Sequence, residues 1–186
     1  MAVFFRNLGK RDSISALALK FCILTACRTN EVIQASWDEI DFKECVWTIP
    51  AERMKSKREH RVPLTNEVMA LLDNLPKLNG WLFSSPQSAK HISNGAMLKL
   101  IKTQLERPDL TAHGFRSTFR DWCAEVSPYP RELAEAALAH VLNDKTEAAY
   151  QRGDLLAKRR ELMQEWENYV HEVHEVHSNV VTMEKK

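Results

Sequence analysis

Hydrophobic residues recur along much of this chain at the spacing of helices. Asp12 and Ser13 are suited to cap a helix whose apolar residues lie on one side: Ile14, Leu17, Phe21, Cys22 and Leu24. This is the first helix that the pattern predicts. A second is predicted from Thr29 to about Ser36, so Arg28 falls at a corner between two helices. A side chain at such a corner can project from the core into a cleft.

The middle of the chain changes to short extended runs. Residues 46–50 and 61–64 predict two strands, and the basic stretch between them is expected to form their exposed connection. A helix should open at residues 64–66 and continue to Leu75. Residues 81–85 predict a further strand or extended segment. Ser93 is then expected to cap a helix that carries Met97, Leu100, Ile101 and Leu105.

The clearest helix is predicted at residues 114–126. Its buried face follows the helical rhythm through Phe115, Phe119, Trp122, Cys123 and Val126. A separate stripe carries three basic side chains at positions i, i+3 and i+7, which are His113, Arg116 and Arg120.

Three further helices complete the pattern. Pro130 is placed for the first turn of a helix that runs to His140. Asp144 and Glu147 resemble a capping box for a short helix that bears Tyr150. A last amphipathic helix is marked by Leu155, Leu162, Met163, Trp166 and Tyr169.

Composition narrows the class of protein. The 186 residues fit one domain with a substantial core, and five glycines with long amphipathic runs indicate a mainly helical fold. The net charge is only +1, so basic charge for an anionic partner must be local, and it concentrates at residues 53–61. The four cysteines lack metal-ligand spacing and predict reduced thiols. Without a signal peptide or a run of roughly 20 apolar residues, we expect a cytoplasmic protein.

Six polar residues spread along the chain suggest one chemistry. They are Arg28, Lys55, His113, Arg116, His140 and Tyr150. Arginine forks match the non-bridging oxygens of a phosphodiester, and a tyrosine phenol can attack phosphorus to form a covalent intermediate. Lysine is a candidate donor of the leaving oxygen's proton, and the histidines can accept or hold protons or hydrogen-bond the phosphate. Together they form a metal-free set for cutting a phosphodiester, with no cofactor.

The stretches that carry these residues resemble the catalytic domain of the tyrosine recombinases, or phage integrases, and most of all prophage and genomic-island integrases. The resemblance runs from about Leu17 to Tyr169 and includes the segments 24–31, 49–55, 60–64, 113–116, 138–140 and 159–163. It implies that the six residues above are the catalytic set and that the acidic Glu31 supports Arg28. The family usually has glycine where Ala26 stands, which affects the turn before Arg28 and removes no reacting group.

The basic connection between the two strands offers two lysines for one role. Lys57 competes with Lys55, although the spacing to Val62 and Pro63 favours Lys55. The other basic residues are candidates for phosphate contacts, and these DNA-binding candidates are Arg53, Lys57, Arg58 and Arg120.

The resemblance also implies an architecture and partners. We expect a mainly α fold with a small antiparallel sheet, the integrase catalytic domain over residues 1–170 and a flexible tail over 171–186. The upstream DNA-binding domain of the family is missing, so the chain is expected to be the C-terminal part of an integrase. The implied partners are double-stranded DNA at attachment sites, further copies in a tetrameric synapse, and accessory DNA-bending or directionality proteins, at the bacterial nucleoid.

Two other functions fit the same residues. A type IB topoisomerase-like enzyme shares the chemistry but relaxes supercoils without synapsis. A non-catalytic DNA-binding remnant of a decayed prophage is the alternative of a different class. In the tail, His171, His174 and His177 could share a helical face as metal ligands, but they lack a fixed carboxylate or cysteine partner, so a solvated extension is favoured.

Overall fold

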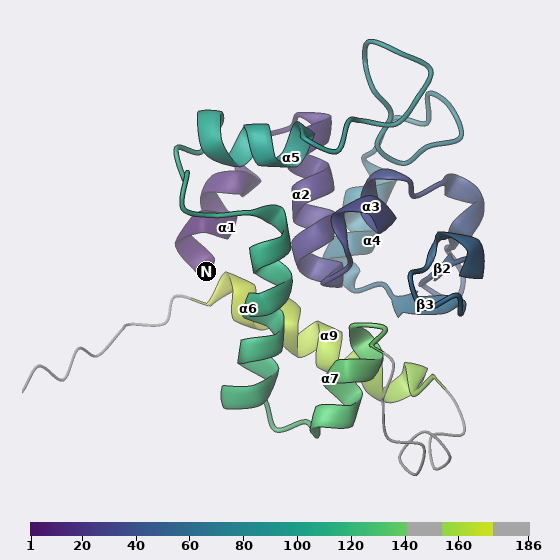
Figure 1. Ribbon diagram of the computed structural model, residues 1–186, viewed down its shortest axis with the longest axis vertical. Coiled ribbons are helices and arrows are strands. Elements are labelled where there is room, and N and C mark those ends of the chain that lie inside the picture. Colours follow the sequence, from purple (N-terminus) through teal and green to yellow (C-terminus); the bar gives the residue numbers. More distant parts are fainter. Residues whose placement is uncertain (141–153, 173–186) are drawn as a thin grey trace, which may run out of the picture.

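The chain folds into a mainly helical domain with a small antiparallel sheet at one end (Figure 1), which confirms the predicted fold class. The computed structural model describes residues 1–140 and 154–172. The α-helices there are α1 Ala2–Gly9, α2 Ile14–Thr25, α3 Thr29–Ile33, α4 Asn66–Asp73, α5 Ala96–Lys99, α6 Ala112–Glu125, α7 Arg131–Ala137 and α9 Leu156–His171. The strands are β1 Ile40–Asp41, β2 Val46–Ile49 and β3 His60–Pro63.

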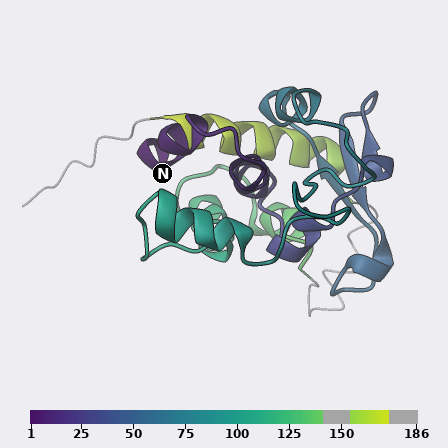
Figure 2. The same cartoon turned by 90° about the horizontal axis from the view of Figure 1, so that it is seen from above.

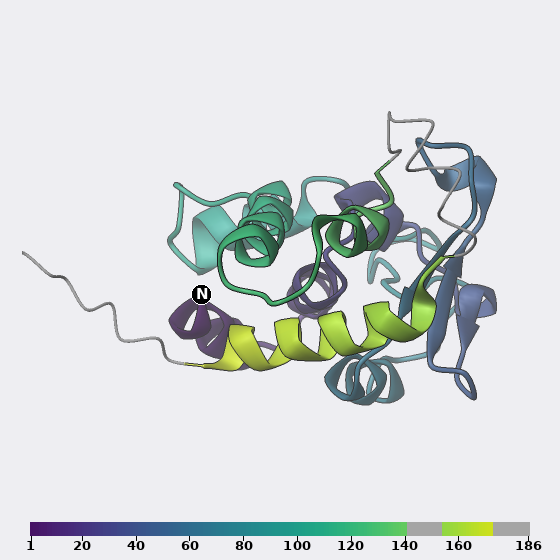
Figure 3. The same ribbon diagram turned by 90° about the horizontal axis from the view of Figure 1, so that it is seen from below.

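Helix α2 is the centre of the fold. It contacts α1, α3, α4, α5, α6 and α9. Figures 2 and 3 show it end-on, with α1, α4 and α9 on one side and α3, α5, α6 and α7 on the other. Ser13 caps it as predicted, because its Oγ accepts the N–H of Ala16 at 3.3 Å.

The prediction that α2 buries a single side is wrong. Ala16, Ala18 and Leu19 are fully buried, whereas the expected core residues Ile14 and Leu17 are only half-buried. A helix with packing partners on several sides has no solvent face to mark by periodicity. The apolar sequence of α2 therefore reflects a central position.

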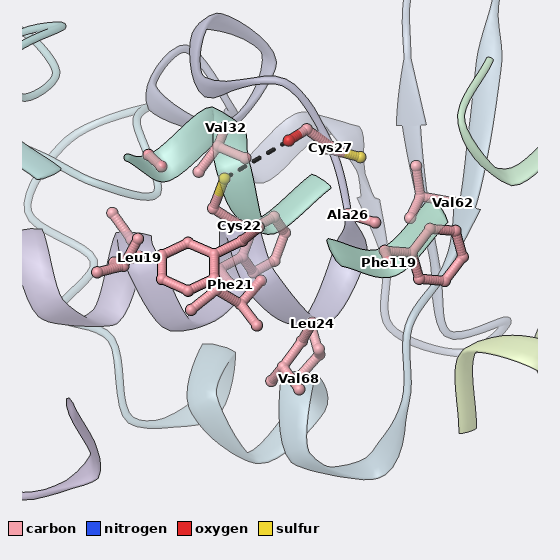
Figure 4. Packing of buried hydrophobic residues seen from close by; sticks show 14 of the residues in the cluster. Leu19, Phe21, Cys22, Leu24, Ala26, Cys27, Val32, Val62, Val68 and Phe119 are labelled. Atoms are coloured by element: carbon pink, nitrogen blue, oxygen red, sulfur yellow. Dashed lines mark hydrogen bonds between the residues drawn. The ribbon is translucent and has the colours of Figure 1, made fainter. Parts of the chain in front are cut away.

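The core joins side chains from several helices and the sheet. Phe21 and Leu24 of α2 lie in one cluster with Val62 of β3, Val68 of α4 and Phe119 of α6 (Figure 4). This packing fixes α2 against the elements that carry the candidate residues.

The cysteines are all free thiols, as the sequence predicted. Within the core, the Cys22 thiol donates to the Cys27 carbonyl at 3.5 Å (Figure 4). Burial raises the pKa of both thiols to about 12, so they are protonated at neutral pH.

The N-terminal helix α1 was not predicted. Phe4, Phe5 and Leu8 are buried, and α1 contacts both α2 and α9. The helix has only eight residues. An apolar pattern this short does not separate a helix from an extended run, so the sequence interpretation began the fold at Asp12.

The sheet has the order β1-β2-β3 with antiparallel pairing throughout. Trp47 of β2 pairs with Ile40 of β1 and Val62 of β3. The strands predicted at 46–50 and 61–64 are present within one residue, and β1 is an addition of only two residues. The segment 81–85, predicted as a strand or extended segment, has a turn at residues 82–83 between two isolated bridges, from Ser36 to Trp81 and from Ser84 to His91.

Several predicted helix ends were wrong. Helix α3 stops at Ile33, before Ser36, and α5 has Gly95 as its N-cap in place of Ser93. Helix α5 then passes into a π-helical turn, η3 Leu100–Gln104. Val126 follows the end of α6 and is 60% exposed, so it is not a core residue.

The C-terminal elements are close to their predictions. Pro130 is the N-cap of α7, and α7 ends at Ala137 before His140 is reached. The short helix expected around Tyr150 lies outside the described residues. Helix α9 is confirmed, with Leu162, Met163 and Trp166 buried. In the described parts of the chain, no helix is long and apolar enough to cross a membrane.

Candidate functional site

Arg28 lies at the corner between α2 and α3, where the sequence placed it. Ala26 ends α2 in the left-handed conformation with φ 52° and ψ 22°, and Arg28 is the N-cap of α3. Nη1 of Arg28 donates to Oε1 of Glu31 at 2.8 Å, and the Arg28 backbone N–H donates to Oε2 at 2.8 Å. The buried Glu31 carboxylate therefore holds both the main chain and the side chain of Arg28.

Arg116 of α6 connects the corner to the end of α7. Its Nη1 donates to the Ala26 carbonyl at 2.6 Å, and its Nη2 donates to the Leu138 carbonyl. The same Nη2 lies 3.2 Å from Nε2 of His140. An arginine has five N–H groups, so two remain for a ligand.

His140 owes its position to the way α7 ends. Ala139 is left-handed with φ 48°, the Ala139 N–H donates to the Ala136 carbonyl at 3.2 Å, and the His140 N–H donates to the Glu135 carbonyl at 3.0 Å. This Schellman arrangement turns the chain back over α7. As a result, Nδ1 of His140 lies 2.5 Å from Oε2 of Glu135.

Glu135 is a site residue that the sequence interpretation missed. It is 8% exposed and also lies 3.7 Å from Nε of Arg120 and 3.9 Å from Nε of Arg131. Glu135 lies five residues before His140 in the sequence, and that spacing alone does not predict a contact. The turn at the end of α7 brings the two side chains together. A charged residue in a short helix otherwise predicts a solvated face.

The two arginines have one hydrogen-bonded carboxylate between them in the described part of the chain. Arg28 and Arg116 face one another closely enough that Arg28 lowers the pKa of Arg116, after burial as the larger cause. Glu31 is the carboxylate hydrogen-bonded to Arg28, and none is paired with Arg116 within the described residues. A small anion with several acceptor oxygens would satisfy both guanidinium groups.

Arg53, predicted to contact DNA, is half-buried and hydrogen-bonded within the protein. Its Nη1 donates to Glu39 and its Nη2 to the Glu31 carbonyl, and it is 17% exposed. Glu39 also accepts from Nε1 of Trp47 at 2.8 Å. These contacts fasten the loop between β2 and β3 to α3, two residues before Lys55.

The other predicted basic residues are on the surface. Four of them make no side-chain hydrogen bond or ion pair to any described residue, and these are Lys55, Lys57, Arg58 and His113. Arg120 is 58% exposed beside Glu135. The structure thus brings together Arg28, Glu31, Arg116 and His140. Tyr150 lies outside the described residues.

Residue 171, which the sequence interpretation assigned to a tail, belongs to a helix. His171 is the last residue of α9, lies 2.5 Å from Oε2 of Glu67 through its Nε2, and packs edge-on against Phe5. His174 and His177 are not among the described residues. Across residues 1–140 and 154–172, no cluster of histidine, cysteine and carboxylate side chains is arranged to hold a metal ion.

Solved structures place this fold among integrases and recombinases. The integrase from mycobacterium phage Brujita matches with a TM-score of 0.69 and 18% identity, over 94% of this chain and 59% of that one. The XerA recombinase matches with a TM-score of 0.60 and 14% identity, over 93% and 62%. At such low identity the likeness shows the fold alone.

The sequence itself gives the family. The model of the phage integrase family matches residues 5–154, and the chain belongs to that family. It is 37% identical to prophage integrase IntA of Escherichia coli (strain K12), over 80% of this chain and 37% of that protein. It is 31% identical to the integrase of Enterobacteria phage P4, over 84% and 40%. The chain therefore spans about two fifths of the length of these curated relatives.

Proposed function

We propose that this chain cuts and rejoins DNA strands through a covalent phosphotyrosyl intermediate, as the catalytic part of a site-specific recombinase. The observation that carries the proposal is the pair of arginines, Arg28 and Arg116, which approach each other with one shared neighbouring carboxylate, Glu31. Both guanidinium groups keep unused N–H donors. A phosphodiester supplies two non-bridging oxygens and the negative charge that the pair lacks.

In the proposed reaction the Tyr150 phenol oxygen attacks phosphorus while the bond from phosphorus to the 5′ oxygen breaks. The phenolic proton passes to a base, for which His113 and His140 are the candidates, and Lys55 protonates the leaving 5′ oxygen. Rejoining reverses these transfers when a 5′ hydroxyl attacks the phosphotyrosyl bond. Arg28 and Arg116 stabilise the charge on the non-bridging oxygens in both directions.

Double-stranded DNA is the proposed substrate, in the compartment that holds the nucleoid. Exposed Lys57, Arg58 and Arg120 are suited to phosphate contacts. Arg53 is better suited to hold the loop that carries Lys55, because its guanidinium already has two partners in the protein. Assembly of four copies on DNA, and accessory DNA-bending or directionality proteins, belong to the same proposal.

Because the attachment site is unknown, the test uses a library. Duplexes with a randomised central sequence and a nick shortly downstream of each candidate cleavage position are incubated with the chain. Cleavage beside the nick releases a short fragment and traps the covalent adduct, which is isolated in detergent and sequenced. We expect adducts with the wild-type chain and none with Tyr150→Phe, which lacks only the attacking oxygen.

The remaining outcomes separate the alternatives. Adducts that persist in EDTA support the metal-free chemistry, whereas loss on chelation with rescue by Mg²⁺ would point to a metal nuclease. Relaxation of any supercoiled plasmid without strand exchange between two captured sites would favour a type IB topoisomerase-like enzyme. DNA binding with no adduct from any library member would favour a non-catalytic remnant.

A further inference from the structure

Arg159 of α9 is a buried arginine that the proposed chemistry does not use. It is 1% exposed, and its Nε has no hydrogen-bond partner among the described residues. Nη1 donates to the Asp154 carbonyl at 3.2 Å, and Nη2 lies 3.5 Å from Nε2 of His60. The Asp154 carboxylate itself pairs with Arg61 at 3.1 Å. The guanidinium of Arg159 therefore has carbonyl and imidazole partners in place of a carboxylate.

His60 of β3 is the second half of this buried contact. It is 7% exposed, and burial, followed by the nearby Arg159 guanidinium, lowers its pKa to about 3. A hydrogen bond to the Ala137 carbonyl acts in the opposite direction. The neutral ring has one N–H donor and one acceptor nitrogen. It can therefore accept from Arg159 at Nε2 while the other ring nitrogen takes a donor's role toward the Ala137 carbonyl.

The three segments that meet here lead to three candidate catalytic residues. Asp154 follows Tyr150 by four residues, His60 follows Lys55 by five, and Ala137 precedes His140 by three. Along the chain, each of these contacts lies within five residues of its candidate residue. The contact between Arg159 and His60 is thus a common anchor for parts of the chain that are far apart in sequence.

We propose that Arg159 and His60 are positioning residues, which fix the strand that follows Lys55, the end of α7 before His140 and the main chain at Asp154 in one arrangement near the arginine pair. This inference rests on the proposed function. Misplacement of a reacting group by about 1 Å can slow a reaction about 100-fold. Loss of the contact between Arg159 and His60 should therefore lower the rate of DNA cleavage. Burial of a guanidinium without a carboxylate costs free energy. An apolar side chain would fill the same space without that cost, but it would make no hydrogen bonds to the neighbouring segments.

Arg160 provides a matched control. It is the next residue of α9, and its guanidinium also donates to two backbone carbonyls, those of Glu44 and of Cys45, the latter at 3.2 Å. These bonds fasten α9 to the turn between β1 and β2, where no candidate residue lies. Loss of either arginine removes two hydrogen bonds from α9, but only Arg159 touches the anchor.

The experiment compares Arg159→Lys, Arg159→Met, His60→Gln and Arg160→Met in the full chain, below the melting temperature of each. A duplex captured from the library is used at saturating protein, and the single-turnover rate of adduct formation is measured beside the dissociation constant. Arg159→Lys keeps the charge and loses the fork, so it remains informative if Arg159→Met does not fold. Hydrogen exchange of the amides at 60–63, 137–140 and 154–158 reports the anchor directly.

We expect Arg159→Lys to slow adduct formation about 10- to 100-fold with DNA affinity changed less than twofold, and to raise exchange in all three segments. Arg160→Met should leave the rate within about twofold and raise exchange only near the turn that it fastens. An undiminished rate in Arg159→Lys, or an equal loss in Arg160→Met, would overturn the positioning role alone. If the wild-type chain forms no adduct with any duplex, the proposed function fails and the positioning role fails with it.

Discussion

Nη2 of Arg116 and Nε2 of His140 lie 3.2 Å apart, and this contact determines which ring nitrogen of His140 carries the proton. A guanidinium can only donate, so Nε2 must accept. The proton of the neutral ring is then on Nδ1, which lies 2.5 Å from Oε2 of Glu135. Glu135, His140 and Arg116 thus form an oriented chain that ends at the proposed phosphate position.

The first prediction tests that orientation through Glu135. Glu135→Met removes the acceptor for Nδ1 and should slow adduct formation on the order of 10- to 100-fold, whereas Glu135→Gln keeps an acceptor oxygen and should lose less. Long-range ¹H–¹⁵N spectra of the histidine rings should show His140 protonated at Nδ1 in the wild-type chain. The exposed Glu132 on the same helix is the control. A Glu132→Met variant as slow as Glu135→Met would mean that α7 responds to any lost charge.

A second prediction concerns the arginine pair. Arg28→Ala or Arg116→Ala should slow adduct formation about 100- to 1000-fold, because one donor aimed at a transition state is typically worth about 2.7 to 4 kcal/mol. Arg116→Ala should also lower the melting temperature more than Arg28→Ala, since Arg116 is buried and bonded to the Ala26 and Leu138 carbonyls. The rate and the melting curve are measured on the same preparations. A wild-type rate in either variant would remove that arginine from the site.

The third prediction concerns the effect of Ala26 on the stability of the fold. Its φ of 52° lies in the region that costs a residue with a Cβ about 1 to 2 kcal/mol. Glycine removes that cost but adds freedom to the unfolded chain, worth about 0.4 to 1 kcal/mol. Ala26→Gly should therefore stabilise the fold by about 0.5 to 1 kcal/mol, measured by urea unfolding.

The matched control for Ala26 lies on the same helix. Ala18 is fully buried in the interior of α2, where glycine is about 1 kcal/mol less favourable than alanine. Ala18→Gly should therefore destabilise the fold. If both glycine variants lower stability, the left-handed turn at Ala26 costs less than its geometry indicates.

The elements that carry the site could be predicted from the sequence, because their apolar periodicity directly reflects burial. The corner at Arg28, the two main strands and the helix of Arg116 follow from such patterns. Helix ends were less accurate. The end of α7 depends on Ala139 in a left-handed conformation, which favours glycine and is therefore not signalled by alanine.

The hydrogen bonds of charged side chains within the protein could not be predicted from the sequence. Arg53, Glu135 and Arg159 have the composition of a solvated surface, and only tertiary contacts distinguish them from it. For Arg159, one feature of the sequence does indicate burial. It precedes Leu162 by three residues and Trp166 by seven, so helical spacing places it on the buried face of α9.

The fourth prediction is a pH dependence that belongs to His60. Its pKa of about 3 in the fold lies below the usual 6.5, so the unfolded chain binds a proton first as the pH falls. Stability from this residue is complete above about pH 6.5 and decreases between there and about pH 3. At pH 5 the loss is about 2 kcal/mol.

The comparison variant for that pH dependence is His60→Gln, which removes the titrating ring and keeps a donor and an acceptor. Urea unfolding at pH 7.5 and pH 5 should show a smaller loss of stability in the variant than in the wild-type chain. Parallel losses would mean that His60 is protonated without penalty in the fold, and that its contact with Arg159 is weaker than the geometry indicates.

The last prediction separates the two lysines of the loop between β2 and β3. Lys55 and Lys57 are both exposed, and Lys57 is left-handed with φ 55°, so the fold leaves the choice to chemistry. A general acid protonates the leaving 5′ oxygen, and a sulfur at that position leaves as a thiolate without help. Lys55→Ala should therefore be slow on normal DNA and nearly restored on the sulfur-bridged duplex. Lys57→Ala should instead weaken binding with a shallower dependence on salt, as the loss of a phosphate contact does.

Arg53 lies two residues before Lys55 and is hydrogen-bonded to Glu39 and Glu31, which limits how far Lys55 can move from the arginine pair. Restoration by sulfur in Lys57→Ala but not in Lys55→Ala would assign the acid to the residue farther from that anchor, and Arg53 would then have no part in placing it.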